Sequence, residues 1–275
     1  MRLGSLLLLA LVVAASATGA SARSNGNILL LRGQHLILVT PAGADVRELT
    51  PPGFEVESAG WSRDGRRVAL GANEHIWVMN ADGSGLRQVT RGNLSESDPS
   101  WSPDGRRIAF SSARTGYEQI WVVPANGGTV RRVSHRTTSC VAPAWSPNGR
   151  WIAYSCNLGF PKLVLARVGG HADRVVTHAA EVIAEEDAAW TPDSKTLLYT
   201  RRRGYGAAGV YSISTTGRRL RRVEAGGSEP SVSPDGRRLA FVRNHHLWIA
   251  RRSGAGAHGV SSGASAEAGP DWGSR

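Results

Sequence analysis

A ten-residue stretch, W-S-P-D-G-R-R-I-A-F from Trp101 to Phe110, constrains the fold of this chain more than any other feature, because it recurs. Related stretches share its turn residues or its apolar end, and their anchor residues are Trp61, Trp101, Trp145, Trp190, Val232 and Trp272. Successive anchors are 40, 44, 45, 42 and 40 residues apart. A fixed period of this length with strand-like content predicts an array of repeated β-units.

Each repeat has the pattern of four short antiparallel strands. In the copy at Trp101, residues 102–105 (S-P-D-G) predict a tight turn, because Pro fixes φ at the second turn position and Gly accepts a positive φ at the last. Strands are expected at 107–111, 119–123 and 130–134, where β-branched and aromatic residues gather. Four strands at this interval are typical of a propeller blade.

The two ends of the chain predict how the array closes. Residues 27–50 contain three strand-like pieces but lack a preceding W-S-P-D-G strand, and the terminal G-P-D-W at Trp272 supplies one. An array whose units cannot bury both faces alone must be capped or closed. We therefore predict an all-β fold, a six-bladed β-propeller of four-stranded antiparallel blades, with the first blade closed by the C-terminal strand.

The first 22 residues have the pattern of a secretory signal peptide. An apolar run from Leu6 to Val13, too short to span a bilayer, precedes the A-x-A pattern Ala20-Ser21-Ala22. An uncleaved membrane anchor is the alternative. The predicted organisation is a signal peptide at 1–22 and a single β-propeller domain at 23–275. The protein is expected to be exported, to the periplasm, the cell envelope or the outside of the cell.

The repeated pattern W-S-P-D-G-R-R-I-A-F…I-W-V…G-G…R-R-V-S resembles the TolB-type β-propeller repeat, a WD40-like repeat also called PD40. The resemblance covers about residues 27–275. Similar repeats occur in the propeller domains of prolyl-oligopeptidase-like and tricorn-type proteases. TolB carries a further α/β domain and those proteases a hydrolase domain, and in this sequence no nucleophile elbow or triad-bearing segment is visible. The resemblance therefore implies the propeller fold.

The two cysteines, Cys140 and Cys156, lie in the repeat of Trp145. A turn at 146–149 would pair Trp145 with Arg150 and bring the two cysteines to within about one residue of each other across the strands. In an exported chain such a pair predicts a disulfide bond. A free thiol or a catalytic cysteine is the alternative.

The chain is basic, with 33 Lys and Arg against 22 Asp and Glu residues and a net charge of +11. Most arginines occupy repeat positions, which predicts a basic rim spread around every blade rather than one groove. A solvated rim is one interpretation, and electrostatic binding to an anionic wall or membrane polymer is the other. We expect no nucleic-acid partner, and membrane contact only through an uncleaved signal segment or surface charge.

Acidic residues precede the inner strands at equivalent positions, where a propeller opens its central channel. Asp98, Asp187 and Glu229 each stand three residues before their anchors, and Glu57 and Glu186 lie nearby. These five carboxylates are the predicted binding site at the channel mouth, on the face with the longer connections. Capping of backbone N–H groups is the alternative role. No cofactor is expected. Calcium is the alternative, and the spacing of blades disfavours shared ligation.

Two functions remain open from the sequence. The first is an exported, monomeric scaffold that binds a protein or peptide partner, in the envelope or outside the cell, through its loop-rich face. The alternative is a propeller hydrolase or lyase with a carboxylate, possibly metal-assisted, site at the channel mouth, which rests on fold analogy. No catalytic residues are assigned, because no nucleophile is paired with a base, and a non-enzymatic role is favoured.

Overall fold

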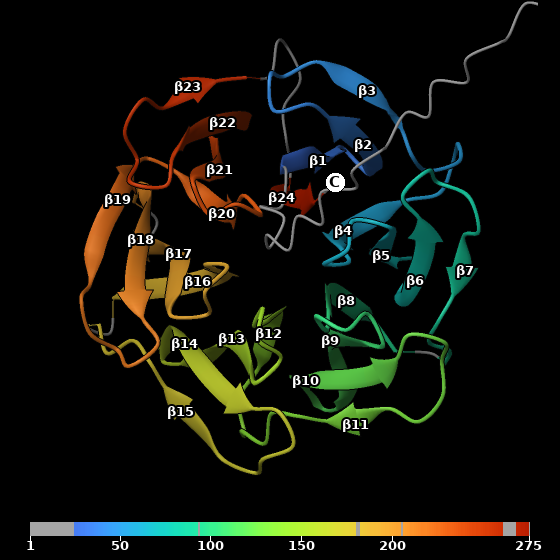
Figure 1. Ribbon diagram of the computed structural model, residues 1–275. Coiled ribbons are helices and arrows are strands. Elements are labelled where there is room, and N and C mark those ends of the chain that lie inside the picture. The colour runs from blue at the N-terminus through green and yellow to red at the C-terminus, as the bar shows by residue number, and fades with distance from the viewer. Residues whose placement is uncertain (1–24, 93, 180–181, 205, 261–267, 275) are drawn as a thin grey trace, which may run out of the picture.

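The computed structural model describes residues 25–92, 94–179, 182–204, 206–260 and 268–274, which form six four-stranded antiparallel sheets around a central axis (Figure 1). The predicted six-bladed propeller is confirmed. The predicted signal peptide lies outside the described residues. Among the residues that are described, no helix is long and apolar enough to cross a membrane.

Each blade runs from an inner strand at the channel to an outer strand at the rim. From the channel outward, blade one consists of β24 (Ala268–Ser274), β1 (Asn25–Arg32), β2 (His35–Val39) and β3 (Asp45–Glu48). Blade two consists of β4 (Val56–Trp61), β5 (Arg67–Ala72), β6 (His75–Asn80) and β7 (Arg87–Gln88). Blade three consists of β8 (Glu96–Trp101), β9 (Arg107–Thr115), β10 (Tyr117–Pro124) and β11 (Arg131–Arg132).

Blades four to six follow the same order. Blade four consists of β12 (Cys140–Trp145), β13 (Trp151–Leu158), β14 (Phe160–Arg167) and β15 (Asp173–Val175). Blade five consists of β16 (Ile183–Trp190), β17 (Thr196–Arg203), β18 (Ala208–Ser214) and β19 (Arg221–Ala225). Blade six consists of β20 (Ser228–Val232), β21 (Arg238–Arg243), β22 (His246–Arg251) and β23 (His258–Gly259). The outer strands are shorter than the sequence predicts, since the strand expected at 130–134 is only β11.

The C-terminal strand closes the first blade, as predicted. β24 pairs antiparallel with β1, with Trp272 opposite Ile28. The Trp272 indole is buried among residues of blades one and six, and its Nε1–H donates to the Gly26 carbonyl at 3.1 Å. The preceding residue, Asp271, accepts a hydrogen bond from the Trp61 backbone N–H of blade two at 2.6 Å. The last strand therefore joins the ring on both sides.

The S-P-D-G turn is stabilised by one hydrogen-bonded unit that recurs in five blades. In blade three the Ser102 hydroxyl donates to Asp104 at 2.5 Å and accepts from the Arg107 N–H at 2.9 Å, while Asp104 accepts from the Arg106 N–H at 3.1 Å. The Ser102 hydrogen bond is the main cause that lowers the pKa of Asp104. Gly105, with φ of 66°, completes the turn. The motif thus fixes the hairpin between first and second strands.

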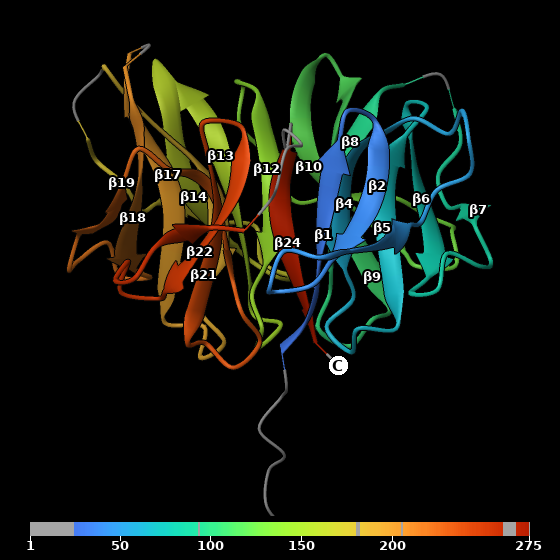
Figure 2. The ribbon, with the colours of Figure 1, turned by 90° about the horizontal axis from the view of Figure 1, so that it is seen from above.

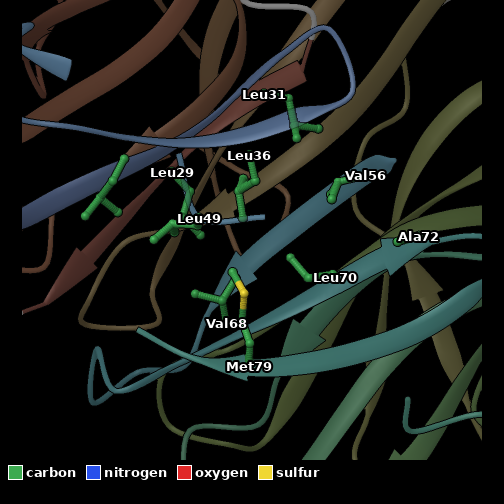
Figure 3. Packing of buried hydrophobic residues seen from close by; sticks show 10 residues of the cluster. Leu29, Leu31, Leu36, Leu49, Val56, Val68, Leu70, Ala72 and Met79 are labelled. Atoms are coloured by element: carbon green, nitrogen blue, oxygen red, sulfur yellow. The ribbon is translucent and has the colours of Figure 1, made fainter. Parts of the chain in front are cut away.

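Neighbouring blades pack through apolar side chains that alternate along their strands. At the first interface Leu29, Leu31 and Leu36 of blade one face Val68 and Leu70 of blade two, as Figure 3 shows. Alternation of side chains along a strand allows each sheet to bury both faces. The cores are therefore six layers between blades, one at each interface.

Repeat arginines and tryptophans complete two of these interfaces. The Arg67 guanidinium of blade two lies 4.4 Å from the ring centroid of Trp101 in blade three, and its Nη2 donates to the Gly105 carbonyl at 2.8 Å. Arg107 and Trp145 repeat the stacking at 4.9 Å. A cation over a tryptophan face is attractive and covers the ring with the arginine stem. The second arginine of R-R is thus part of the interface.

Cys140 and Cys156 form a disulfide bond between β12 and β13, and their Cα atoms face each other across the strands. The expected strand register was wrong at the turn, because Trp145 pairs with Ile152 instead of Arg150. A bulge between Val141 and Ala144 absorbs the difference and restores the cysteines to opposite positions.

Figure 2 shows the propeller from the side, with the inner strand β24 running down toward the C-terminus. All inner strands run in this direction, so the turns after first and third strands share the lower face. The upper face carries the connections from outer strands to the next blade and the hairpins between second and third strands. We call these the tight-turn face and the loop-rich face.

We expect Trp272→Ala to lower the free energy of unfolding by about 3–5 kcal/mol, because it opens a cavity in the closing strand. For a domain of this size the melting temperature should fall by roughly 6–20 °C. Tyr117→Ala is the control, since that ring is 58% exposed. Deletion of 268–275 should be more severe. Equal melting temperatures for parent and Trp272→Ala would contradict the closure.

Reduction of the disulfide is expected to destabilise the fold by about 3 kcal/mol, since the bond closes a loop of 16 residues' separation. Urea unfolding with and without reductant measures this loss, and a Cys140→Ser/Cys156→Ser variant should not respond to reductant. Thiol titration of the unreduced, denatured protein should find no free thiol. Two reactive thiols would overturn the bond.

Candidate functional site at the channel mouth

The site begins with a bulge that recurs near the start of the inner strands. Asp98, Ala142, Asp187 and Glu229 each adopt a left-handed backbone conformation, with φ between 52° and 55°. Strand pairing shifts register at each of these points. A left-handed non-glycine residue costs free energy and persists only where its surroundings determine it. The bulge therefore redirects these side chains away from regular pleating.

Hydroxyl groups of the preceding blade secure this backbone. The Asp98 N–H donates to the Ser58 hydroxyl at 2.9 Å, and the Glu229 N–H donates to the Thr200 hydroxyl at 2.8 Å. The Asp98 carboxylate accepts from the Ser97 and Ser111 hydroxyls, both at 3.0 Å. Hydroxyl groups of the preceding blade, rather than carboxylates, thus accept the backbone N–H groups of Asp98 and Glu229.

The bulged positions surround a cavity of about 280 Å³ on the loop-rich face. Four of the five predicted carboxylates line it: Glu57, Asp98, Asp187 and Glu229. The fifth, Glu186, is not part of the lining and accepts a hydrogen bond from Arg202 Nη2 at 2.8 Å. The structure thus brings together carboxylates from blades two, three, five and six, and their binding role remains a prediction.

Asp271, which the sequence reasoning missed, also lines the cavity. It stands directly before an anchor, and none of the other five repeats has an acidic residue there. That departure from the repeat was the available signal. With Asp271 included, five carboxylates and no Lys, Arg or His side chain line the cavity within the described part of the chain.

Two of these carboxyl groups titrate near neutral pH. Burial, with the nearby charges of Asp187 and Glu186, raises the pKa of Glu229 to about 7. Burial and the charges of Glu186 and Asp98 raise the pKa of Asp187 to about 6, against the opposing effect of a Thr200 hydrogen bond. Burial likewise raises the pKa of Asp271. The negative charge of the mouth therefore grows as pH rises through the neutral range.

The cavity does not have the geometry of a metal centre. No group of three or more His, Cys, Asp or Glu side chains in the described residues is placed to hold a metal ion. The carboxylates come from separate blades around the channel, which keeps them too dispersed to share one cation closely. The arrangement suits an elongated cationic ligand that meets several carboxylates at once.

Residues 49–157 match the family model described as the TolB beta propeller domain, which confirms the predicted resemblance over that span. No curated protein matches the sequence. Two similar solved structures are TolB from Acinetobacter baumannii, with a TM-score of 0.75 and 17% identity over 90% of this chain, and putative TolB from Agrobacterium tumefaciens, with 0.72 and 18% over 88%.

The chain spans 65% of the length of the Acinetobacter baumannii protein and 91% of the Agrobacterium tumefaciens protein. A chain of the nidogen/laminin complex is also similar, with a TM-score of 0.74, 12% identity and coverage of 90% of this chain and 97% of that one. Similarity at these identities establishes the shared propeller fold and leaves the role of the channel mouth to its own residues.

The raised pKa values predict how stability depends on pH. Because the folded protein keeps protons on Asp187 and Glu229 that the unfolded chain has lost, the free energy of unfolding should fall as pH rises from about 4 to about 7. Over this range the free energy of unfolding of an Asp187→Asn/Glu229→Gln variant should fall by on the order of 2 kcal/mol less than that of the parent. Urea unfolding at pH 4 and pH 7 measures this difference.

The exposed Glu118→Gln change provides the control for that experiment, because Glu118 lies outside the cavity lining. Its pH profile should follow the parent's. An identical decline in the double variant and the parent would show that the two mouth carboxyls do not carry the effect.

Proposed function

We propose that this protein is an exported propeller scaffold that binds a basic segment of a protein or peptide partner at its channel mouth. The observation that carries the proposal is a cavity lined by five carboxylates and no cationic side chain of the described residues, in a chain with net charge +11. A local acidic site attracts a cationic ligand, even though the net positive charge of the whole protein repels it.

Apolar side chains around the mouth support a protein partner. Of the five large hydrophobic residues exposed in the described chain, four lie in connections or at strand ends of the loop-rich face: Leu94 at 41%, Tyr117 at 58%, Leu158 at 36% and Val182 at 44%. Exposed aromatic and aliphatic groups near a polar pocket favour protein contact. The cavity would bind a chain end or long side chains of the partner, and the rest of the partner would contact the loops.

The proposed export rests on the signal-peptide pattern and on the similarity to TolB propellers. An oxidising destination also agrees with the disulfide between Cys140 and Cys156, since such bonds persist mainly outside the reducing cytosol. The partner would then be a protein of the envelope or of the cell exterior.

A fluorescent oligo-lysine peptide tests the proposal directly. The parent should bind it, and an Asp98→Asn/Asp187→Asn/Glu229→Gln variant should bind at least about tenfold more weakly, as fluorescence anisotropy would show. The parent should also bind more tightly at pH 8 than at pH 5.5, because its mouth carboxyls are then ionised. Isosteric changes keep the bulges intact.

A matched control removes the same charge elsewhere on the loop-rich face. Glu55, Glu74 and Glu118 are exposed and do not line the cavity, so their triple Gln variant should bind the peptide within about twofold of the parent. Equal weakening in both triple variants would show that overall charge, rather than the mouth, attracts the peptide. No binding by the parent would refute the site.

The hydrolase or lyase alternative is favoured by a separate observation. With pKa values of about 7 and about 6, Glu229 and Asp187 offer one protonated and one ionised carboxyl near neutral pH, as general acid–base chemistry requires. Turnover of carbohydrate or ester substrates by the parent, lost in the mouth variant, would identify an enzyme and displace the scaffold proposal.

A further inference from the structure

A second concave site lies on the opposite, tight-turn face, between blades five and six. It is a groove of about 790 Å³ formed by the turns 191–196 and 214–219 of blade five, by the outer strand β19, and by residues Arg252 and Ser253 of blade six. It shares no lining residue with the channel mouth. The two sites are therefore structurally separate.

The groove gathers positive charge. Six cationic side chains line it, with Asp193 as the single carboxylate: Lys195, Arg218, Arg219, Arg221, Arg222 and Arg252. None of the six forms an ion pair with a carboxylate in the described parts of the chain. Most arginines occupy repeat positions in other blades, and the R-R-L-R-R run of blade five brings four more into this groove.

A change in the repeat accounts for the space. Interfaces two–three and three–four are filled by the Arg67–Trp101 and Arg107–Trp145 pairs. At interface five–six the equivalent positions are Thr196 and Val232, which are both much smaller. Thr196 lines the groove. Loss of the large arginine and tryptophan side chains thus leaves a hollow where interfaces two–three and three–four are filled.

The chemistry of the lining selects the kind of anion. Hydroxyl side chains such as Ser212, Thr215 and Ser253 stand among the guanidinium groups, and no aromatic side chain lines the groove. Arginine forks bind phosphate, sulfate and carboxylate groups, and hydroxyls bind sugar hydroxyls, whereas single-stranded nucleic acids need aromatic rings for base stacking. Leu220, the apolar residue of the run, is 48% exposed but is not part of the lining.

The cationic surface continues beyond the groove. Arg222 also lines a neighbouring cavity of about 430 Å³, together with Arg201 and Arg203. Arg201 is paired with Glu185 at 3.5 Å, and Arg203 adds a further cation toward the loop-rich face. A track of this kind along one blade fits a chain of regularly spaced anions better than a single ion.

We propose that the groove between blades five and six binds an acidic glycan, a polymer of sugars that bears sulfate, phosphate or carboxylate groups. The probe is a size-defined heparin oligosaccharide, titrated against the mature chain at physiological ionic strength. The parent should bind, and an Arg218→Gln/Arg219→Gln/Arg221→Gln/Arg222→Gln variant should bind at least about tenfold more weakly. Because these side chains are exposed and form no ion pair with a described carboxylate, the variant should keep the parent's melting temperature.

A control variant removes four arginines from other blades: Arg66, Arg106, Arg131 and Arg150, each changed to Gln. All four are exposed, so the net charge falls equally without touching the groove. Its affinity for heparin should stay within about twofold of the parent's. An equal loss of heparin affinity in both variants would show that overall charge attracts heparin, and the proposed groove site would be wrong.

Two further ligands separate acidic glycans from other anionic surfaces. Duplex DNA of matched length and vesicles of anionic phospholipid should bind more weakly than heparin and lose less affinity in the groove variant. If DNA or the vesicles bind as tightly as heparin or more tightly, and the groove variant loses that binding, the groove is a site for nucleic acid or for membrane lipid. The acidic-glycan proposal would then be wrong. The oligo-lysine peptide should bind the groove variant as it binds the parent.

Discussion

Closure of the ring by β24 is the constraint on which the rest of the structure depends. A blade has two apolar faces, so an open array would leave apolar surface exposed at each end. Trp272 is buried among residues of the first and last blades, and Asp271 accepts the Trp61 N–H of blade two. The two ends of the described propeller thus meet in one sheet, which holds all six inner strands at a common channel.

Within this ring the repeat separates residues that build the scaffold from residues that vary freely. The Ser102–Asp104 turn and the stacking of Arg67 on Trp101 exemplify the constant part. The bulged position places fewer demands on its side chain, since it is Asp98, Ala142, Asp187 or Glu229 in different blades. At Asp98, Ala142 and Glu229 a hydroxyl of the preceding blade accepts the backbone N–H. A binding surface can therefore change there while the fold is kept.

Two concave sites on opposite faces of the disc are lined by side chains of opposite charge. The loop-rich face opens into a cavity lined by carboxylates, with exposed apolar residues around it. The tight-turn face carries a groove lined by five arginines and Lys195. The two sites share no lining residue, so none of the groove arginines lines the acidic mouth. One ring thus carries two concave sites of opposite charge on opposite faces.

The sequence by itself determined the number of blades, their strands and the closing partner, because turns and alternation are local and the 40–45-residue period repeats them. It also indicated four of the carboxylates at the mouth, since equivalent repeat positions share one ring. Only the tertiary structure decided the rest: the bulge that sets the strand register between Cys140 and Cys156, the arrival of Asp271 in the cavity, and the groove beside Thr196. These depend on a register shift within one blade and on contacts between blades, which periodicity does not encode.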